Sequence, residues 1–360
     1  MSSHKNINIV VFGIGNVGST FVQQIIAAKK DLQQQQQLQV NLVAITNSQY
    51  AFFNEDGVSD AWEANFKTAS FPYQVSDIIK YVNAQRYENL IAIDATASED
   101  LVRYYIPLIQ NGFHIVSANK IANTLHYEFY KELRQALKKY NKEFLYETNV
   151  GAGLPIIDTI KNLYLSGDKI QKIRGVFSGS LSYIFNAFSS EDLPFSKVLN
   201  NASKIGLTEP DAREDLSGKD VARKLLILAR ELNIESEFND VEVQSLVPKK
   251  LNGKTTLHQF NTRKRELDEP FLLLKKSIKN NRVLRYVAEL DTQTKKMEVK
   301  LTTVDKFSAL GQLKDADSIF EVYTESYGNT PLIIQGAGAG KSVTARGLFA
   351  DVLKVSHSLN

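Results

Sequence analysis

The 360-residue sequence predicts an α/β fold, with a domain built on a parallel β-sheet over residues 1–149 and an α+β domain over residues 150–334. Three observations support this prediction. Short apolar strands alternate with helices in the first part, strands group together in the second, and a glycine-rich turn directly follows the first strand. The closing segment, residues 335–360, contains a helix that we expect to pack back on the first domain.

The first domain is predicted from alternating patterns. Its opening strand, Ile7–Phe12, is a β-branched and aromatic run typical of a strand buried on both faces. The glutamine run Gln33–Gln37 is predicted to be a solvated linker. Further strands are predicted at residues 40–45, 90–93, 113–116 and about 143–146, and helices at 75–82, 100–110 and 127–140. Strands that alternate with helices in this way form βαβ units and a parallel sheet.

The second domain has a different pattern. Strands are predicted at residues 170–177, 283–290 and 297–301, and helices at 181–188, 195–205 and 220–232. This grouping favours an antiparallel or mixed sheet. A strand at residues 331–334 then leads through a glycine-rich loop into a helix at residues 342–353.

The composition excludes several classes of protein. With 43 basic and 40 acidic side chains, the net charge of +3 is too small to indicate a nucleic-acid or membrane partner. The chain has no cysteine, so disulfides, thiolate metal sites and cysteine nucleophiles are excluded. No apolar run approaches the ~20 residues of a spanning helix, and the polar N-terminus is not a signal peptide. We therefore expect a cytoplasmic protein.

The glycine turn has the pattern G-x-G-x-x-G, formed by Gly13, Gly15 and Gly18. It follows a strand and opens an amphipathic helix, which is the context of a Rossmann-type dinucleotide site. The first glycine permits the tight turn, the second lets the backbone approach a pyrophosphate, and the third allows close packing of helix and strand. The helix N-terminus presents unpaired N–H groups to the phosphates.

The second strand is followed by Thr46, Asn47 and Ser48, where many NAD sites carry an acidic residue that binds the ribose 2′-hydroxyl. No carboxylate here repels a 2′-phosphate, and no adjacent arginine attracts one. Asn47 is therefore a candidate cofactor residue, and the choice between NAD and NADP stays open.

Two other strand ends carry candidate residues. Thr96, Ala97 and Ser98 follow the strand at residues 90–93 and suit a loop beside the nicotinamide half, although Ser98 also suits a helix N-cap. Lys120 follows the strand at residues 113–116, and the carboxyl ends of such strands face the ligand crevice of open α/β sheets. An exposed lysine without function is the alternative.

Two further loops of the sequence are rich in glycine. Glu147 begins a loop that continues to Pro155, and its carboxylate with nearby carbonyls suits a hard monovalent cation or, equally, a hinge between domains. The sequence GAGAGKS from Gly336 imitates the phosphate loop of nucleoside triphosphatases. It lacks the required first glycine, since Gln335 occupies that position.

The most informative segment holds the carboxylates Glu209, Asp211, Glu214, Asp215 and Asp220, followed by Lys224. Asp220 and Lys224 are four residues apart and share one helix face. A surface ion pair alone, worth about 0.3–0.5 kcal/mol, does not explain so dense a cluster in a loop containing proline and glycine. A pocket for the ammonium of an amino acid, with a lysine to handle a proton, explains it.

Taken together, the segments resemble homoserine dehydrogenase along nearly the whole chain. The family reduces L-aspartate 4-semialdehyde to L-homoserine with NAD(P)H, on the path to threonine and methionine. The matching motifs are GIGNVG from Gly13, SANK from Ser117, ETNVGAGLP from Glu147, GVFSGSLSYIFN from Gly175, GLTEPDAREDLSGKDVARK from Gly206 and GAGAGKSVTARG from Gly336.

The resemblance implies a role for each matching residue. The proton donor to the aldehyde oxygen would be Lys224, with Lys120 as second candidate, and the substrate's amino acid end would bind at Glu209, Asp215 and Asp220. A monovalent cation, Na⁺ or K⁺, would lie on Glu147 and the carbonyls of Val150, Ala152 and Leu154. The nucleotide would contact residues of the glycine turn and of later loops: Ile14, Asn16, Val17, Thr96, Lys120, Gly206 and Gly338.

The resemblance also implies a homodimer built on the sheet of the second domain. Little chain precedes the glycine turn or follows the last predicted helix. We therefore expect a monofunctional form without an aspartokinase or an amino-acid-sensing domain. The alternatives are another two-domain amino-acid dehydrogenase and a non-catalytic nucleotide sensor, which would need neither Lys120 nor Lys224.

Overall fold

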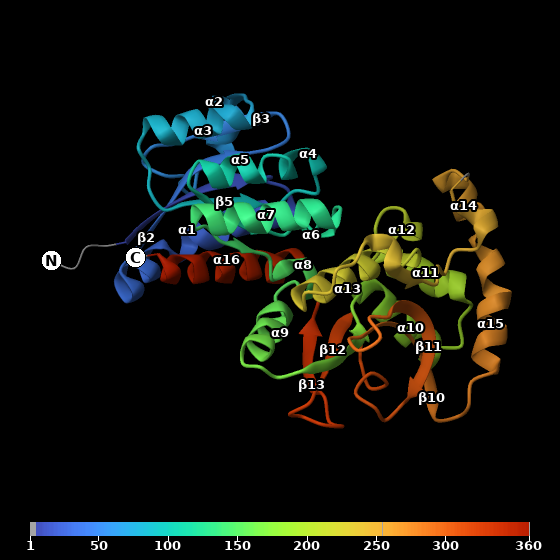
Figure 1. The fold of residues 1–360 in the computed structure, drawn as a ribbon. Helices are drawn as coiled ribbons and strands as arrows, with labels where there is room; N and C mark the ends of the chain where they lie inside the picture. Colours follow the sequence, from blue (N-terminus) through green and yellow to red (C-terminus); the bar gives the residue numbers. More distant parts are fainter. Residues whose placement is uncertain (1–4, 254, 360) are drawn as a thin grey trace. The chain divides into compact units, whose positions relative to one another are not determined.

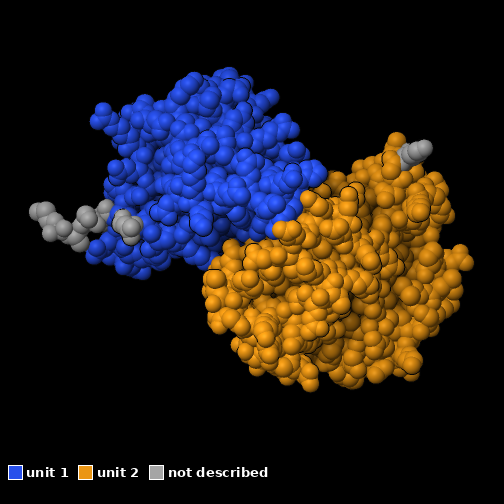
Figure 2. Space-filling model, in the orientation of Figure 1, with its two compact units in different colours: residues 1–153, 340–360 blue, residues 154–339 orange. Residues whose placement is uncertain are grey.

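The computed structural model describes residues 5–253 and 255–359, and the chain forms two compact units (Figure 2). Unit 1 comprises residues 1–153 and 340–360, and unit 2 comprises residues 154–339. The junctions therefore follow residues 153 and 339, whereas the sequence analysis placed them after 149 and 334. The second one moves because strand β13 (Leu332–Ala337) continues beyond residue 334.

Unit 1 contains a seven-stranded sheet in the order β4-β3-β2-β1-β5-β6-β7. The predicted parallel sheet is confirmed for strands β1 (Lys5–Phe12), β2 (Leu38–Thr46), β5 (Leu90–Asp94), β6 (Phe113–Ser117) and β7 (Phe144–Leu145). Two antiparallel strands that the sequence analysis missed, β3 (Tyr50–Phe53) and β4 (Phe71–Pro72), extend the edge beyond β2. β3 pairs with β2, and β4 pairs with β3.

The longest helix of unit 1 in the described chain, α1 (Asn16–Gln36), begins at the glycine turn. The prediction of a glutamine linker was wrong, because α1 continues through this run and ends only where Gln37 turns left-handed, with a φ of 54°. Glutamine is a good helix former, and Leu32 is buried in this last part of the helix. The other N-terminal helices are α2 (Trp62–Ala69), α3 (Val75–Ala84), α4 (Glu99–Val102), α5 (Tyr105–Gln110), α6 (Ile121–Thr124), α7 (Tyr127–Tyr140) and α8 (Thr148–Gly151).

The last helix, α16 (Lys341–Ser358), belongs to unit 1 and lies beside α1 (Figure 1). Its buried apolar side chains join the core formed by β1, β2 and α1; they are Ala345, Leu348, Phe349, Val352 and Val355. The expected return of the C-terminal helix to the first domain is confirmed. The core of unit 1 is thus assembled from both ends of the described chain.

Unit 2 contains a six-stranded mixed sheet in the order β13-β12-β8-β10-β11-β9. Its strands are β8 (Ile170–Val176), β9 (Val241–Val243), β10 (Arg282–Asp291), β11 (Met297–Asp305), β12 (Asp317–Thr324) and β13. All neighbours are antiparallel except β9 and β11, which are parallel. The predicted α+β class of this part is therefore confirmed.

The helices of unit 2 include two that carry the candidate site, α10 (Gly179–Ser190) and α13 (Lys219–Glu231). The others are α9 (Ile156–Leu165), α11 (Phe195–Lys204), α12 (Ala212–Leu216), α14 (Leu257–Arg263) and α15 (Asp268–Lys276), with short 3₁₀ turns at Phe238–Asp240, Lys249–Leu251 and Lys264–Leu267. Among the described residues, no helix combines the length and apolar character that crossing a bilayer requires.

The packing of α16 makes a prediction about stability. Leu348 is fully buried in the core of unit 1, so Leu348→Ala should lower the free energy of unfolding of this unit by about 2–5 kcal/mol. Leu165→Ala is the matched control, because Leu165 is 80% exposed, and it should change stability by less than about 0.5 kcal/mol. Urea denaturation measures both. Equal effects of the two substitutions would show that α16 is not part of the core.

Candidate active site

The glycine turn of unit 1 is held by close contacts that exclude side chains. A Cβ atom on Gly18 would lie 1.8 Å from the carbonyl oxygen of Gly13, and one on Gly13 would lie 2.7 Å from Cγ2 of Thr96. Gly13 also has a φ of 90°, which favours glycine. A Cβ on Gly15 would meet nothing within 4 Å, so open space lies beside the N-cap of α1. These features fit a pyrophosphate approaching the helix N-terminus.

The other predicted residues of this turn lie on the same helix start. Ile14 and Val17 are half-buried against the core of unit 1, while Asn16 is exposed as the first residue of α1. The first turn of α1 contains no acidic residue. The partial positive charge of the helix N-terminus is therefore not neutralised by a neighbouring carboxylate in that turn.

The side chain of Asn47 has a fixed orientation at the end of β2. Its Oδ1 accepts hydrogen bonds from the backbone N–H groups of Gln49, at 2.8 Å, and Tyr50, at 2.7 Å. Only the oxygen of an amide can accept these hydrogen bonds, so they fix Oδ1 and not the Nδ2 donor on the loop backbone. The Tyr73 hydroxyl is 3.0 Å from Thr46 Oγ1 and 3.2 Å from the Asn47 carbonyl oxygen, which supports the same loop.

A buried polar network fixes the loop after β5. Asp94, which is 1% exposed, accepts hydrogen bonds from the backbone and hydroxyl of Thr96, from the Tyr105 hydroxyl and from Asn119 Nδ2. Burial raises the pKa of Asp94, and these hydrogen bonds oppose the shift. Thr96 Oγ1 in turn accepts the backbone N–H of Ser98. The loop Thr96-Ala97-Ser98 is therefore rigidly attached to β5.

Ser98 occupies the N-cap position of α4, but its side chain makes no capping hydrogen bond. The prediction of a helix N-cap is therefore right for the position of Ser98, but its hydroxyl does not cap the helix. Lys120 lies at the N-cap position of α6, directly after Asn119, whose amide links the loops after β5 and β6. Both sequence-predicted residues thus lie at the carboxyl edge of the parallel sheet.

The four residues predicted to hold a cation are divided between the units. Glu147, Val150 and Ala152 belong to unit 1 and Leu154 begins unit 2. Glu147 is 5% exposed, and the carbonyl oxygen of Leu154 accepts the backbone N–H of Ile156 at 2.9 Å. In the part of the chain that the structure describes, no group of three or more histidine, aspartate or glutamate side chains is arranged to hold a metal ion.

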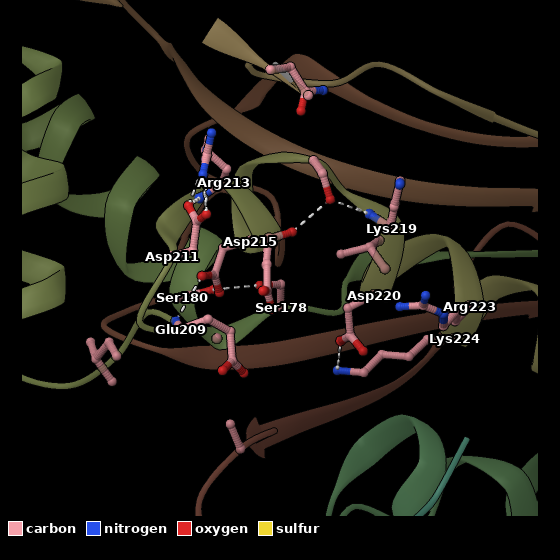
Figure 3. Close-up of a pocket in the computed structure, with 18 of the residues that line it drawn as sticks. Ser178, Ser180, Glu209, Asp211, Arg213, Asp215, Lys219, Asp220, Arg223 and Lys224 are labelled. Carbon is pink, nitrogen blue, oxygen red and sulfur yellow. Dashed lines mark hydrogen bonds and ion pairs between the residues drawn. The ribbon is translucent and has the colours of Figure 1, made fainter. Parts of the chain in front are cut away.

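Unit 2 contains a cavity of about 600 Å³ lined by the acidic segment (Figure 3). Four residues predicted from the sequence line this cavity: Glu209, Asp215, Asp220 and Lys224. The N-terminal residues of α10, Ser178 to Ser180, form another part of its wall. The structure thus brings the predicted substrate residues and the predicted proton donor to one place.

Lys224 is a buried, positively charged group in this wall. It is 8% exposed, and its Nζ donates a hydrogen bond of 2.7 Å to the carbonyl oxygen of Phe177. The same Nζ lies 3.3 Å from Asp220 Oδ2, one helical turn earlier on α13. Asp220 therefore orients the lysine in addition to lining the cavity.

Asp215 and Asp211 differ in their surroundings. Burial raises the pKa of Asp215, and the charge of Asp220 adds to this effect against hydrogen bonds from Ser180 and the Glu209 backbone. Hydrogen bonds from Arg213 lower the pKa of Asp211 instead. Arg213 also donates to the backbone and hydroxyl of Thr255, so Asp211 and Arg213 join two loops of the wall. This structural pair was not recognised in the sequence.

Three glycines near these sites have structural explanations. Gly206 ends α11 in a left-handed conformation, where its N–H and that of Leu207 donate to the carbonyls of Ser203 and Ala202. Gly338 packs against Ser318, because a Cβ there would lie 2.0 Å from its Oγ. A Cβ on Gly218 would lie 2.0 Å from the Tyr286 hydroxyl. The cofactor roles expected for Gly206 and Gly338 stay predictions.

The fold and the two sites define a class of protein: two-unit enzymes that combine a dinucleotide-binding α/β unit with an acidic, lysine-containing cavity on an α+β unit. Residues 13–147 match the family model described as homoserine dehydrogenase, NAD binding domain, and residues 155–353 match the model described as homoserine dehydrogenase. The chain belongs to the homoserine dehydrogenase family.

Individual relatives agree with this assignment. The chain is 36% identical to the homoserine dehydrogenase of Saccharomyces cerevisiae, covering 99% of this chain and 100% of the relative. It is 37% identical to the bifunctional aspartokinase/homoserine dehydrogenase of Haemophilus influenzae, covering 98% of this chain but 43% of the relative. The chain thus spans less than half the length of the bifunctional relatives. A solved Candida auris protein of unknown function superimposes with a TM-score of 0.89 at 34% identity, covering 98% and 99% of the two chains.

Proposed function

We propose that this protein catalyses the NAD(P)H-dependent reduction of L-aspartate 4-semialdehyde to L-homoserine and the reverse oxidation. The observation that carries the proposal is the cavity of unit 2, which joins a buried lysine with five carboxylates, three of them the predicted substrate residues. The open N-terminus of α1 beside Gly15 supports NAD(P) binding. When bound, the nicotinamide supplies the hydride.

The residues of the cavity have complementary tasks. The carboxylates of Glu209 and Asp215 accept hydrogen bonds from the substrate's ammonium group, and Asp220 orients Lys224. As the aldehyde carbon is reduced, negative charge develops on its oxygen. The Lys224 ammonium stabilises this charge and delivers the proton, and in the reverse direction it accepts the proton from the hydroxyl. Lys120 is the second candidate for this role.

The role of Lys224 predicts a large loss of turnover on its removal. Lys224→Met should lower kcat for homoserine oxidation by roughly 10²–10⁴-fold, the usual contribution of a positioned acid–base group. Lys197→Met is the matched control, because Lys197 is exposed on α11, outside the cavity, and it should leave kcat unchanged. Steady-state kinetics, with circular dichroism to verify folding, measures both. Near-normal turnover of Lys224→Met would contradict the mechanism.

The orientation of Asn47 predicts cofactor use. Its Oδ1 is held by the loop backbone and its Nδ2 group is an uncharged donor, so NADP(H) should be used at least comparably to NAD(H). Asn47→Asp keeps the oxygen that accepts from Gln49 and Tyr50, but replaces the donor with a charged acceptor. It should lower the ratio of kcat/KM for NADP⁺ to that for NAD⁺ by about 10- to 100-fold. Asn54→Asp, a similar change in the turn after β3, is the control. The same ratio in both variants would show that Asn47 does not read the ribose.

We extend the proposal to a homodimer formed through the sheet of unit 2. Antiparallel register places Ile333, Glu321, Arg174 and Glu289 in one row across four strands, on one face of the sheet. The loop containing Leu310 covers part of this face, where it packs on apolar side chains. Beyond that loop the row includes the exposed side chain of Ile333. A second copy would cover this remaining surface.

The proposed dimer predicts that a charged side chain placed in its interface weakens the association. Ile333 is 44% exposed, so Ile333→Glu should fold normally but shift the protein from twice its chain mass of 40.4 kDa toward that mass itself. Leu165→Glu introduces the same charge at an exposed leucine of α9 and should leave the mass unchanged. Sedimentation equilibrium distinguishes the two. A wild-type protein that sediments as a monomer would overturn the proposal.

We further propose that Na⁺ or K⁺ binds at Glu147 and the carbonyls of Val150, Ala152 and Leu154. The burial of the Glu147 carboxylate supports this, as do the last carbonyls of the short helix α8, which lack intrahelical partners by position. We also propose a cytoplasmic location, in keeping with a reaction that draws on the cell's nicotinamide cofactors.

A further inference from the structure

Two serines at the start of α10 form a hydrogen-bonded chain that ends on Asp215. Ser180 Oγ lies 2.6 Å from Asp215 Oδ1, and Ser178 Oγ lies 2.9 Å from Ser180 Oγ (Figure 3). A carboxylate only accepts, so the single hydroxyl hydrogen of Ser180 goes to Asp215. Ser178 must therefore donate to Ser180, while its own oxygen accepts the backbone N–H of Leu181 as the helix N-cap. The hydrogen bonds are therefore all donated in one direction, from Ser178 to Ser180 and from Ser180 to Asp215.

The carboxylate of Asp215 is held on both of its oxygens. Ser180 donates to Oδ1, and the backbone N–H of Glu209 donates to Oδ2 at 2.9 Å. The backbone N–H of Asp215 itself also donates to this carboxylate. A carboxylate has about four acceptor sites, so these three donors leave acceptor capacity for a ligand in the cavity that Asp215 lines. Ser180 is 8% exposed, so water competes little for its hydrogen bond.

The hydrogen bonds to Asp215 matter because other charged groups line the same cavity and influence its protonation. The other acidic groups that line the same cavity are Glu209, Asp211, Glu214 and Asp220. The basic groups there are Lys219, Arg223, Lys224 and Arg213, which is bound to Asp211. Burial and the charge of Asp220 raise the pKa of Asp215, whereas the hydrogen bonds from Ser180 and Glu209 oppose that rise. Loss of the Ser180 hydroxyl would therefore favour the protonated form of Asp215.

We propose that Ser180, backed by Ser178, is a positioning residue that keeps the Asp215 carboxylate aimed at the ammonium group of the substrate and ready to accept its hydrogen bonds. The inference rests on the proposed function for the identity of the ligand. The geometry of the serine chain itself does not depend on it.

The test compares Ser180→Ala with Ser182→Ala, a matched change at a buried serine of the same helix outside the cavity. In homoserine oxidation, Ser180→Ala should raise KM about tenfold or more and move the acidic limb of kcat/KM to higher pH. The dissociation constant for NADPH should be unchanged. Ser180→Thr, which keeps a hydroxyl, should restore the wild-type profile. Ser182→Ala should resemble the wild type throughout.

A Ser180→Ala enzyme with the KM and pH profile of Ser182→Ala would overturn the inference and leave the proposed function standing. Carbon-13 NMR titration of Asp215 without substrate tests the inference about Ser180 independently of the proposed function. The Asp215 pKa should be higher in Ser180→Ala than in wild type even if homoserine is not the substrate. An unchanged Asp215 pKa would overturn the inference whatever the protein oxidises.

Discussion

The carboxyl edge of unit 1 depends on the burial of one charged group, Asp94. An ionised carboxylate inside a protein is strongly destabilising unless hydrogen bonds compensate the loss of water. Here Thr96, Tyr105 and Asn119 supply those hydrogen bonds, and they come from the loop after β5, from α5 and from the loop after β6. The methyl group of Thr96 then limits the space at Gly13. The need to satisfy one carboxylate thus fixes the two loops and the glycine turn together.

In unit 2, too, the hydrogen-bond partners of each buried or partly buried carboxylate determine its properties, and these partners differ within one cluster of acidic residues. Asp211 is neutralised by Arg213 and joins two loops, whereas Asp215 has only uncharged donors and keeps acceptor capacity toward the cavity. Their pKa values shift in opposite directions for this reason. Asp220 differs again, because its partner is Lys224 on the same helix. Neighbouring carboxylates of one sequence segment thus differ in their partners and in the acceptor capacity that they keep toward the cavity.

Sequence reasoning could find the glycine turn and the i,i+4 pair of Asp220 and Lys224, whose residues are close in the chain. It could also find the parallel strands, because strands that alternate with helices predict them without any knowledge of the pairing. It missed β3 and β4 because four-residue and two-residue strands carry too little pattern. It overlooked Ser178 and Ser180 because their partner, Asp215, lies 35 residues beyond Ser180, and only the fold brings them together. Gly206 was assigned to the cofactor by resemblance, although a helix stop accounts for a glycine there. The glutamine run was predicted to be a linker from its composition alone. Composition does not show that a nearby residue, Leu32, packs into the core and holds the end of the helix.

The return of α16 to unit 1 has a consequence for the order in which the protein acquires its structure during synthesis. Phe21, Val22 and Ile25 of α1 share their core with Leu348 and Val352, which the ribosome adds only after residues 154–339. At about 5–20 residues per second, that intervening segment takes roughly 10–40 s to make. Unit 2 is continuous in the chain and has all its strands by then, so it is the unit that can be completed first. Until then, the nascent nucleotide-binding unit lacks the apolar side chains of α16 that complete its core.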